Sequence, residues 1–294
     1  MRINKFFPQY LFNANEITGD KLRRLLKVAP KAEASLAVRA LRKFNMPGSL
    51  FLEMYPLEDN AVGEKLTAAK IVDEKGLADL RSEPGDAGLN FIQSLLDTEM
   101  YTPAQVLELL KKFDDGPCPI CVVMENAFNG KFAQEWDSFC EYVKSFLDSL
   151  NRFTGEIAIV SDAKGVDPVH AMGVMPQEFN GVSQRIGGDQ SLVTGIAAVD
   201  EDWCGLASCY SGETIPLLND MAVDSVSELL NVINGIYAVE TARKHLEMDL
   251  DAPRSAQMPA FPQPEKLVVK VSAACGEFYL ILAKEEFLPP TTIF

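Results

Sequence analysis

Two polar residues within the stretch 224–238 could do chemistry. Asp224, Glu228, Asn231 and Gly235 follow one another at spacings of four, three and four, which aligns them in one stripe along a helix. Glu228 and Asn231 then project together from adjacent turns. A carboxylate beside a carboxamide offers an acceptor for a cation next to a group that both donates to water and accepts from it. Such pairs also occur on solvated helix surfaces, so the pair alone leaves both interpretations open.

The elements that would position this helix are predicted to include two hairpins. Extended segments separated by turn residues are expected at 156–160, 182–186, 192–198, 205–210, 267–273 and 278–282. Segments 192–198 and 205–210 are expected to pair across an acidic turn at 200–202, and the last two segments are expected to pair through 275–277. Hairpins without crossover helices predict an antiparallel sheet with long helices on one face, which is an α+β architecture.

Helices are predicted on either side of these strands. An amphipathic helix is expected from Trp136 to Leu150, a short helix over 212–221, and the long helix of the stripe over 223–247. The short apolar run 120–124 is either a strand or a buried link.

The order of these pieces over residues 130–294 resembles the CheX-type chemotaxis phosphatase domain of the CheC/CheX/FliY family. The family's helix carries Glu-x-x-Asn, then an apolar pair and a small residue, and here the chain reads Glu228-Leu-Leu-Asn231-Val-Ile-Asn-Gly235. Three further pieces come in the family's order: the segments within 195–215, the stretch 246–253 that ends in a proline, and the terminal hairpin 266–282.

The resemblance implies a hydrolase that acts on the aspartyl phosphate of a CheY-like response-regulator receiver. Asn231 would hold and orient the attacking water, and Glu228 would pair with the receiver's active-site lysine. Asp224 and Gly235 would belong to the docking face. The receiver brings its own Mg²⁺, so this chain is expected to bind no metal or other cofactor. The alternative is a non-catalytic signalling adaptor that docks a receiver through the same face.

The resemblance also bears on oligomeric state. The first helix of the domain carries no second Glu-x-x-Asn of the kind found in CheC and FliY, because Glu141 is followed at the third position by Lys144. A single motif is the CheX arrangement, and the resemblance to CheX domains implies a homodimer.

The first part of the chain is expected to form a separate all-α domain, so the predicted domains are 1–115 and 116–294. Three phrases, 17–26, 71–80 and 101–110, each place an apolar residue, a capping or turn residue and a helix that ends in leucines. In the last phrase, Thr102 is the expected N-cap and Pro103 the first helical residue.

These repeated helical hairpins resemble the N-terminal domain of type II secretion ATPases. Some members of that family bind cyclic di-GMP through an Arg-Leu-Gly opening in each repeat. In this chain only Gly63 matches that opening, so a docking or spacer module is the alternative to a nucleotide sensor.

The distribution of charge argues against a nucleic-acid partner. Residues 1–113 contain 16 Lys and Arg and 15 Asp and Glu, whereas residues 114–294 contain 11 and 27. An acidic half without a basic stripe repels phosphate backbones. The chain has no uninterrupted apolar run of about 18 residues and no apolar leader pattern, so a cytoplasmic protein without membrane insertion is expected.

Cysteines and histidines supply the remaining candidates. Six cysteines are spread along the chain, which favours reduced thiols over a disulfide framework. Cys118-Pro-Ile-Cys121 has the spacing of zinc and redox centres, but a zinc site needs two more ligands, and His170 and His245 have no partner spacing. Thiols without a ligand are therefore the favoured interpretation.

Overall fold

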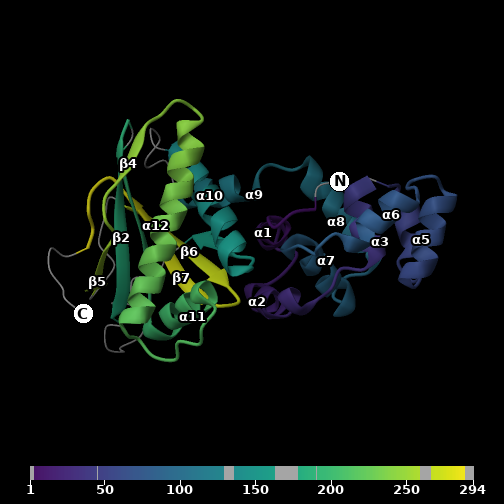
Figure 1. Cartoon of the computed structure of the whole chain (residues 1–294), viewed down its shortest axis with the longest axis horizontal. Helices are drawn as coiled ribbons and strands as arrows, with labels where there is room; N and C mark the ends of the chain where they lie inside the picture. The colour runs from purple at the N-terminus through teal and green to yellow at the C-terminus, as the bar shows by residue number, and fades with distance from the viewer. Residues whose placement is uncertain are drawn as a thin grey trace. The chain divides into compact units, whose positions relative to one another are not determined.

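The chain folds into two compact units, Met1–Pro119 and Ile120–Phe294. The computed structural model describes residues 3–44, 46–128, 136–162, 178–189, 191–258 and 266–288. Figure 1 shows helices in the first unit and a sheet with helices in the second. Within the described ranges, no helix has both the length and the apolarity that a membrane span requires.

The described residues of the first unit form helices and no strand. The elements are α1 Phe7–Asn13, α2 Gly19–Val28, the 3-10 turn η1 Ala29–Lys31, α3 Leu36–Phe44, α4 Gly48–Met54, α5 Asp59–Ala68, α6 Glu74–Ser82, α7 Ala87–Asp97 and α8 Pro103–Asp115. Each is amphipathic enough to bury apolar side chains, among them Phe7, Leu22, Phe51 and Phe91, which are fully buried.

The three predicted hairpins share one turn geometry. Asn15, Lys70 and Glu99 adopt positive φ angles of 55°, 55° and 51°. In each turn the next residue donates its N–H to a leucine carbonyl at the end of the preceding helix, and the partners are Leu11, Leu66 and Leu95 at 3.0, 3.0 and 3.1 Å. This is the left-handed helix ending in which a 6→1 bond satisfies a free carbonyl.

The N-cap of the next helix follows three residues after each positive-φ residue. Thr18, Asp73 and Thr102 accept the backbone N–H of the residue three positions on. Thr102 and Gln105 also form a reciprocal capping box, and Pro103 occupies the first helical position as predicted. The repeat seen in the sequence is therefore a structural repeat.

The described residues of the second unit form a seven-stranded antiparallel sheet. Its strands are β1 Ile159–Asp162, β2 Phe179–Gly188, β3 Leu192–Ala198, β4 Met248–Leu250, β5 Arg254–Met258, β6 Lys266–Ala273 and β7 Gly276–Ala283. The order is β1-β6-β7-β3-β2-β4, with β5 also paired to β2. The predicted hairpin between β6 and β7 is confirmed, and so is the α+β architecture.

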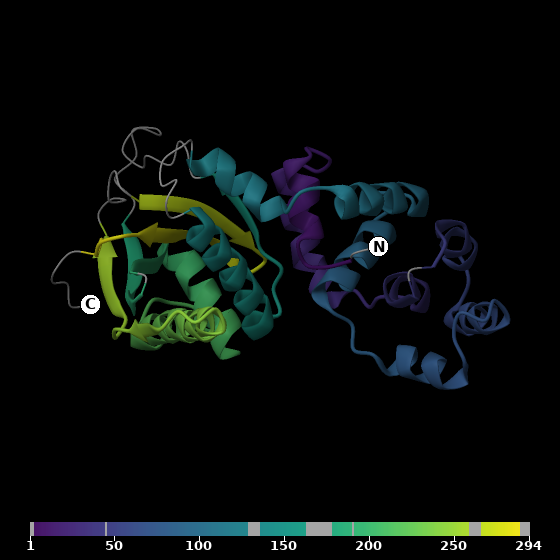
Figure 2. The ribbon, with the colours of Figure 1, turned by 90° about the horizontal axis from the view of Figure 1, so that it is seen from above.

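The described helices of the second unit are α9 Pro119–Phe128, α10 Trp136–Thr154, α11 Asp200–Ser211 and α12 Asp220–Ala242. One face of the sheet carries α10, α11 and α12. Helix α12 contacts α10 and α11 as well as β2, and α11 contacts β7 and β3. Figure 2 shows α10 and α12 on the same side of the sheet.

The two faces alternate along each strand, as the pleat requires. On β2, Val182 and Gln184 face the helices, while Ser183 faces the opposite side and donates to Glu286. That opposite side holds its own buried cluster: Phe179, Val193, Ala197, Ala256, Met258, Ile281, Ala283, Phe287 and Leu288.

The predicted hairpin between 192–198 and 205–210 is wrong, because residues 200–211 form helix α11. Asp200, Glu201 and Asp202 occupy its first turn, where the positive end of the helix dipole stabilises carboxylates. Gly205 lets this helix approach the β6–β7 turn, since an added Cβ would lie 2.1 Å from the carbonyl oxygen of Cys275. The true partners of β3 are β2 and β7.

Three further boundaries differ from the predictions. Residues 212–219 are not helical, because Gly212 ends α11 with a φ of 74° and Asn219 caps the start of α12. The long helix ends at Ala242 rather than near 247, since His245 has a φ of 63° and β4 begins at Met248. The apolar run 120–124 belongs to helix α9.

Candidate functional site

Helix α12 presents the predicted stripe on the side away from the core. Its buried residues include Val226, Leu229, Leu230, Ile233 and Tyr237. Asp224 and Glu228 are exposed, and Asn231 and Gly235 are partly exposed at the border of the buried face. All four thus reach the surface on one side of one helix, and Asn231 also contacts β2.

Exposed apolar side chains lie at both ends of this stripe. Leu217 and Met221 precede Asp224 and are 74% and 43% exposed, and Val239 follows Gly235 at helical spacing and is 60% exposed. Each of these side chains leaves a large part of its apolar surface open to solvent. The candidate docking face comprises Leu217, Met221, Asp224, Glu228, Asn231, Gly235 and Val239, a polar centre with apolar ends.

Asn231 is anchored to the sheet by a side chain that the motif does not contain. Gln184 of β2 donates from Nε2 to Asn231 Oδ1 at 2.8 Å and to the backbone carbonyl of Asp251 at 2.7 Å. With its Oδ1 facing inward, Asn231 directs its Nδ2 away from Gln184. Among the described residues, no hydrogen bond uses this Nδ2 group, so it remains for an incoming molecule.

A buried polar network continues inward from Gln184. Asn234, one turn along α12 and fully buried, donates from Nδ2 to Gln184 Oε1 at 2.7 Å and to Thr194 Oγ1 at 2.9 Å. Tyr142 of α10 donates its hydroxyl to Asn234 Oδ1 at 2.5 Å. Complete burial raises the pKa of Tyr142, so it stays protonated and serves as a donor.

No hydrogen bond or ion pair to another described residue anchors Glu228, and Tyr210 lies close to it. Tyr210 of α11 stacks edge-on against Phe153 of α10, with ring centroids 6.4 Å apart. Burial raises the pKa of Tyr210, and the negative charge of Glu228 raises it further. Glu228 is therefore a surface carboxylate close to Tyr210, whereas Asn231 is held by the sheet.

The other sequence candidates do not assemble into a site. Within the described ranges, no three His, Cys, Asp or Glu side chains gather as metal ligands would. Cys118 and Cys121 are partly buried, and His170 lies outside the described residues. Gly188 is the glycine of a β2–β4 contact, since its φ is 106° and an added Cβ would lie 2.3 Å from the Glu247 carbonyl oxygen.

Gln184 and its partners are the residues that the sequence prediction missed. Gln184 and Thr194 lie on different strands, are cross-strand neighbours in the β2–β3 register, and are both fully buried. The available signal was weak: a glutamine within the segment 182–186, which was predicted to be extended. Its distance of 47 positions from Asn231 hides the contact in the sequence.

Comparison with known proteins gives a likeness to solved structures. The chain is similar to a CheC-like superfamily protein from Shewanella sp. PV-4, with 17% sequence identity, 50% of this chain and 96% of that chain covered, and a TM-score of 0.40. It is similar to chemotaxis protein CheX from Vibrio vulnificus, with 14% identity, 49% and 95% covered, and a TM-score of 0.38. It is also similar to the CheX–CheY–BeF3–Mg²⁺ complex from Borrelia burgdorferi, with 17% identity, 49% of this chain and 98% of that chain covered, and a TM-score of 0.34.

No family model matches the sequence, and the search of curated proteins gave no match. The predicted resemblance to CheC-like and CheX proteins is confirmed as a likeness over about half of the chain. The resemblance of the N-terminal helices to secretion ATPases stays a prediction.

Proposed function

We propose that the chain binds the phosphorylated receiver domain of a CheY-like response regulator and accelerates hydrolysis of its aspartyl phosphate. One observation carries the proposal: Glu228 and Asn231 reach the surface from adjacent turns of α12, and Asn231 has its amide N–H groups directed outward. A receiver is the partner of CheX in the Borrelia burgdorferi complex, and its role as partner here belongs to the proposal.

Asn231 would act on the attacking water. With one lone pair of Oδ1 occupied by Gln184, the carboxamide keeps a second lone pair and two N–H donors. A water held by one of these donors and by that lone pair keeps an electron pair for phosphorus. Its oxygen forms the new P–O bond as the bond to the aspartyl oxygen breaks, so the receiver regains its carboxylate and phosphate leaves with the water's protons or releases them to solvent.

Glu228 would set the register of docking. An exposed carboxylate can pair with the lysine of a receiver's active site, and this pair would place Asn231 opposite the phosphoryl group. Because phosphoryl transfer depends mostly on positioning and charge stabilisation, two well-placed groups suffice when the receiver supplies its Mg²⁺. The expectation that this chain holds no metal of its own is part of the same proposal.

The experiment measures phosphate release from a panel of receivers that have been phosphorylated with acetyl phosphate and Mg²⁺. The full chain is expected to speed release for its cognate receiver. Asn231→Ala should bring the rate back to the receiver's own rate while binding to the BeF3⁻-treated receiver is retained. Glu228→Ala should weaken binding by less than about tenfold, since an exposed ion pair contributes at most about 1 kcal/mol.

The matched control is Glu285→Ala, which removes another exposed glutamate of the same unit. It should leave both binding and release unchanged. If the wild-type chain binds a receiver but does not change its rate of phosphate release, the result would support the adaptor alternative and contradict the hydrolase function. Absence of binding to every receiver would contradict both.

A further inference from the structure

Gln184 uses its whole carboxamide inside the protein. Its Nε2 donates to Asn231 Oδ1 and to the Asp251 carbonyl, and its Oε1 accepts from Asn234 Nδ2. The side chain is 1% exposed. Gln184 is thus the link between a buried network and Asn231, which lies at the surface.

An irregularity in the sheet supplies the backbone carbonyl that holds Gln184. Ile186 pairs with Leu250 of β4, and Ser183 pairs with Arg254 of β5. Three residues, Asp251 to Pro253, therefore stand opposite two residues of β2, as in a β-bulge. Proline has no N–H for a ladder bond, and the carbonyl of Asp251 accepts from the Gln184 side chain within this interruption.

This anchoring fixes which way each amide points. The Asp251 carbonyl can only accept, so the group of Gln184 beside it must be Nε2. The same Nε2 then requires an acceptor on Asn231, which is Oδ1. At the inner end, Asn234 presents Nδ2 to Gln184, and its Oδ1 accepts the hydroxyl of Tyr142. The inner end agrees with this orientation, and the Asp251 carbonyl is the group that fixes it, because a hydroxyl can donate or accept.

We infer that Gln184 is a positioning residue that holds the Asn231 carboxamide with its N–H groups outward, in the orientation required for a water at the docking face. The inference rests on the proposed function for its catalytic consequence. Its structural part concerns this chain alone. Without Gln184, the Asn231 side chain would sample other rotamers and the reversed amide, and fewer molecules would present donors to the water.

A buried polar network can also serve only to specify packing. The two roles differ at the outer end. A network with a packing role has no need of Asn231, whose Nδ2 side faces outward, and its loss would disturb the fold without selectively changing turnover. A positioning role requires that loss of Gln184 loosens Asn231 and lowers kcat while receiver binding remains.

The test uses the full chain with Gln184→Met and Gln184→Glu. The methionine fills a similar volume without any donor. The glutamate keeps an acceptor for Asn234, and because burial favours its neutral form, its one O–H can replace only one of the two bonds that Gln184 Nε2 donates. The first readout is the NMR order parameter of the Asn231 side-chain amide, assigned by its disappearance in Asn231→Ala. The second is kcat for phosphate release beside the dissociation constant for the BeF3⁻-treated receiver.

We expect a rigid Asn231 amide in the wild type and a mobile one in both variants, with kcat lower by roughly 10- to 100-fold and receiver affinity within about threefold. The control is Ser183→Ala, which removes a fully buried polar group from the opposite face of the same strand, where it donates to Glu286. It should change neither the amide nor kcat. Where the methionine variant does not fold, the glutamate variant decides.

An Asn231 amide that stays equally rigid in the Gln184 variants would overturn the inference, and so would an unchanged kcat in an active enzyme. A wild-type chain that releases no phosphate from any receiver would instead refute the proposed function. The order parameters would still decide whether Gln184 orients Asn231.

Discussion

Glu228 and Asn231 stand one turn apart but are held in different ways. The carboxylate is exposed, so water and salt screen its interactions, and in the proposed complex it would contribute mainly to encounter and register. The carboxamide is tied to Gln184, so its geometry is set before any partner arrives. A group that orients a water gains from such preorganisation, because no rotamer entropy is lost when the partner binds.

Another pair of side chains in the same unit has chemistry of its own. Cys209 of α11 and Cys275 of the β6–β7 turn form a side-chain hydrogen bond, which lowers the pKa of the Cys209 thiol. The pKa of Cys275 is raised by the same bond and by burial. The thiolate form therefore belongs to Cys209, which is partly exposed.

A pH dependence follows for Cys209. Because its pKa is lowered, its thiolate is present at a lower pH than that of an ordinary cysteine, and its rate of alkylation by iodoacetamide should reach half its maximum at a correspondingly lower pH. In Cys275→Ala this midpoint should move upward. Peptide mass spectrometry after timed labelling measures both midpoints, with Cys121 of the same chain as an internal comparison. If the midpoint for Cys209 were the same in Cys275→Ala as in the wild type, the hydrogen bond from Cys275 would not be the cause of the lowered pKa.

Among the elements, α12 has one position on its candidate docking face without a side chain, Gly235. An added Cβ there would meet only the Leu250 side chain, at 4.0 Å. The helix itself therefore has room for a larger residue, although glycine inside a helix costs about 1 kcal/mol relative to alanine. A partner that packs against the backbone of α12 would explain why glycine serves at this position.

Two substitutions separate stability from docking at Gly235. Gly235→Ala should raise the free energy of unfolding by about 0.5 to 1 kcal/mol, measured by urea denaturation. Gly235→Leu should also keep a stable helix but weaken receiver binding by about tenfold or more, measured by titration calorimetry. Equal receiver affinity for both variants would show that the partner does not approach α12 there.

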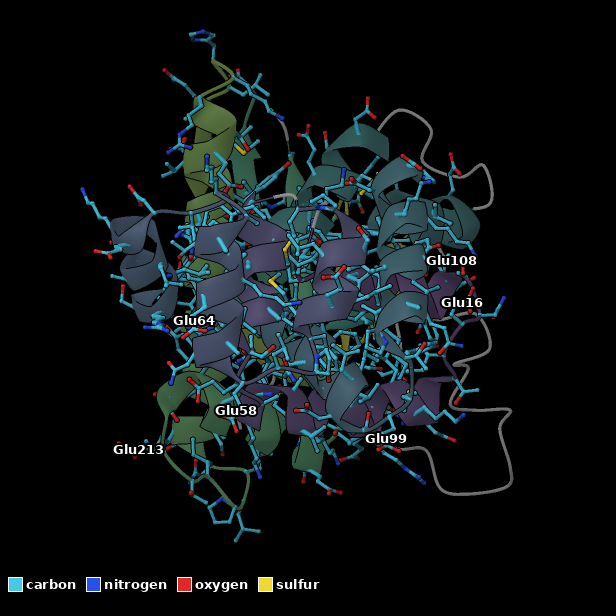
Figure 3. The ribbon with its side chains drawn as sticks, turned by 90° about the vertical axis from the view of Figure 1, so that its right-hand side faces the viewer. Glu16, Glu58, Glu64, Glu99, Glu108 and Glu213 are labelled. Atoms are coloured by element: carbon cyan, nitrogen blue, oxygen red, sulfur yellow. The ribbon has the colours of Figure 1, made fainter. Side chains whose placement is uncertain are left out.

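In the shared turns of the first unit, introducing a glycine is expected to stabilise the fold, whereas at Gly235 removing one is. Glu99 adopts a φ of 51°, which strains any residue with a Cβ, and its side chain is exposed at the surface, as Figure 3 shows. Glu99→Gly should therefore stabilise the unit by roughly 0.5 to 1 kcal/mol. Lys111→Gly, in the middle of α8, is the control and should destabilise by a similar amount. Thermal unfolding monitored by circular dichroism distinguishes the two signs.

How far the sequence predicts these elements depends on where their determinants lie. The turns at Thr18, Asp73 and Thr102 were predictable because a cap and its helix are neighbours in the chain. The stripe on α12 was predictable for the same reason. Helix α11 was mistaken for a strand, because small residues around Gly205 fit either element and the acidic cluster also resembles a turn.

The determinants that the sequence hides are long-range contacts. Gly205 of α11 packs closely against the carbonyl of Cys275, a residue 70 positions away. What holds Asn231 is Gln184 together with a bulge whose carbonyl comes from Asp251. Local periodicity in a sequence does not predict such contacts. The Glu228–Asn231 motif could therefore be found in the sequence, but the residues that hold Asn231 could not.

In the molecule as a whole, the helical unit and the unit with the sheet each have a hydrophobic core of their own. The helical unit buries Phe51, whose ring lies 5.8 Å from that of Tyr55. The unit with the sheet buries Phe278, whose ring lies 6.3 Å from that of Phe146. Each unit thus has large buried side chains of its own, which is the usual basis for separate cooperative unfolding.

Separate cores predict separate responses to a cavity. Phe51→Ala should destabilise the helical unit by about 3 to 5 kcal/mol, a large share of the 5 to 15 kcal/mol typical of a domain. Hydrogen exchange followed by mass spectrometry should then show lost protection in peptides before Pro119, with β6 and β7 still protected. Phe278→Ala should give the reverse pattern and, because Phe278 packs on the side of the sheet that carries α12, should also lower phosphate release from the receiver. Protection lost equally in both units after either substitution would mean that the chain unfolds as one cooperative body, and the docking face would then depend on the helices of the first unit for its stability.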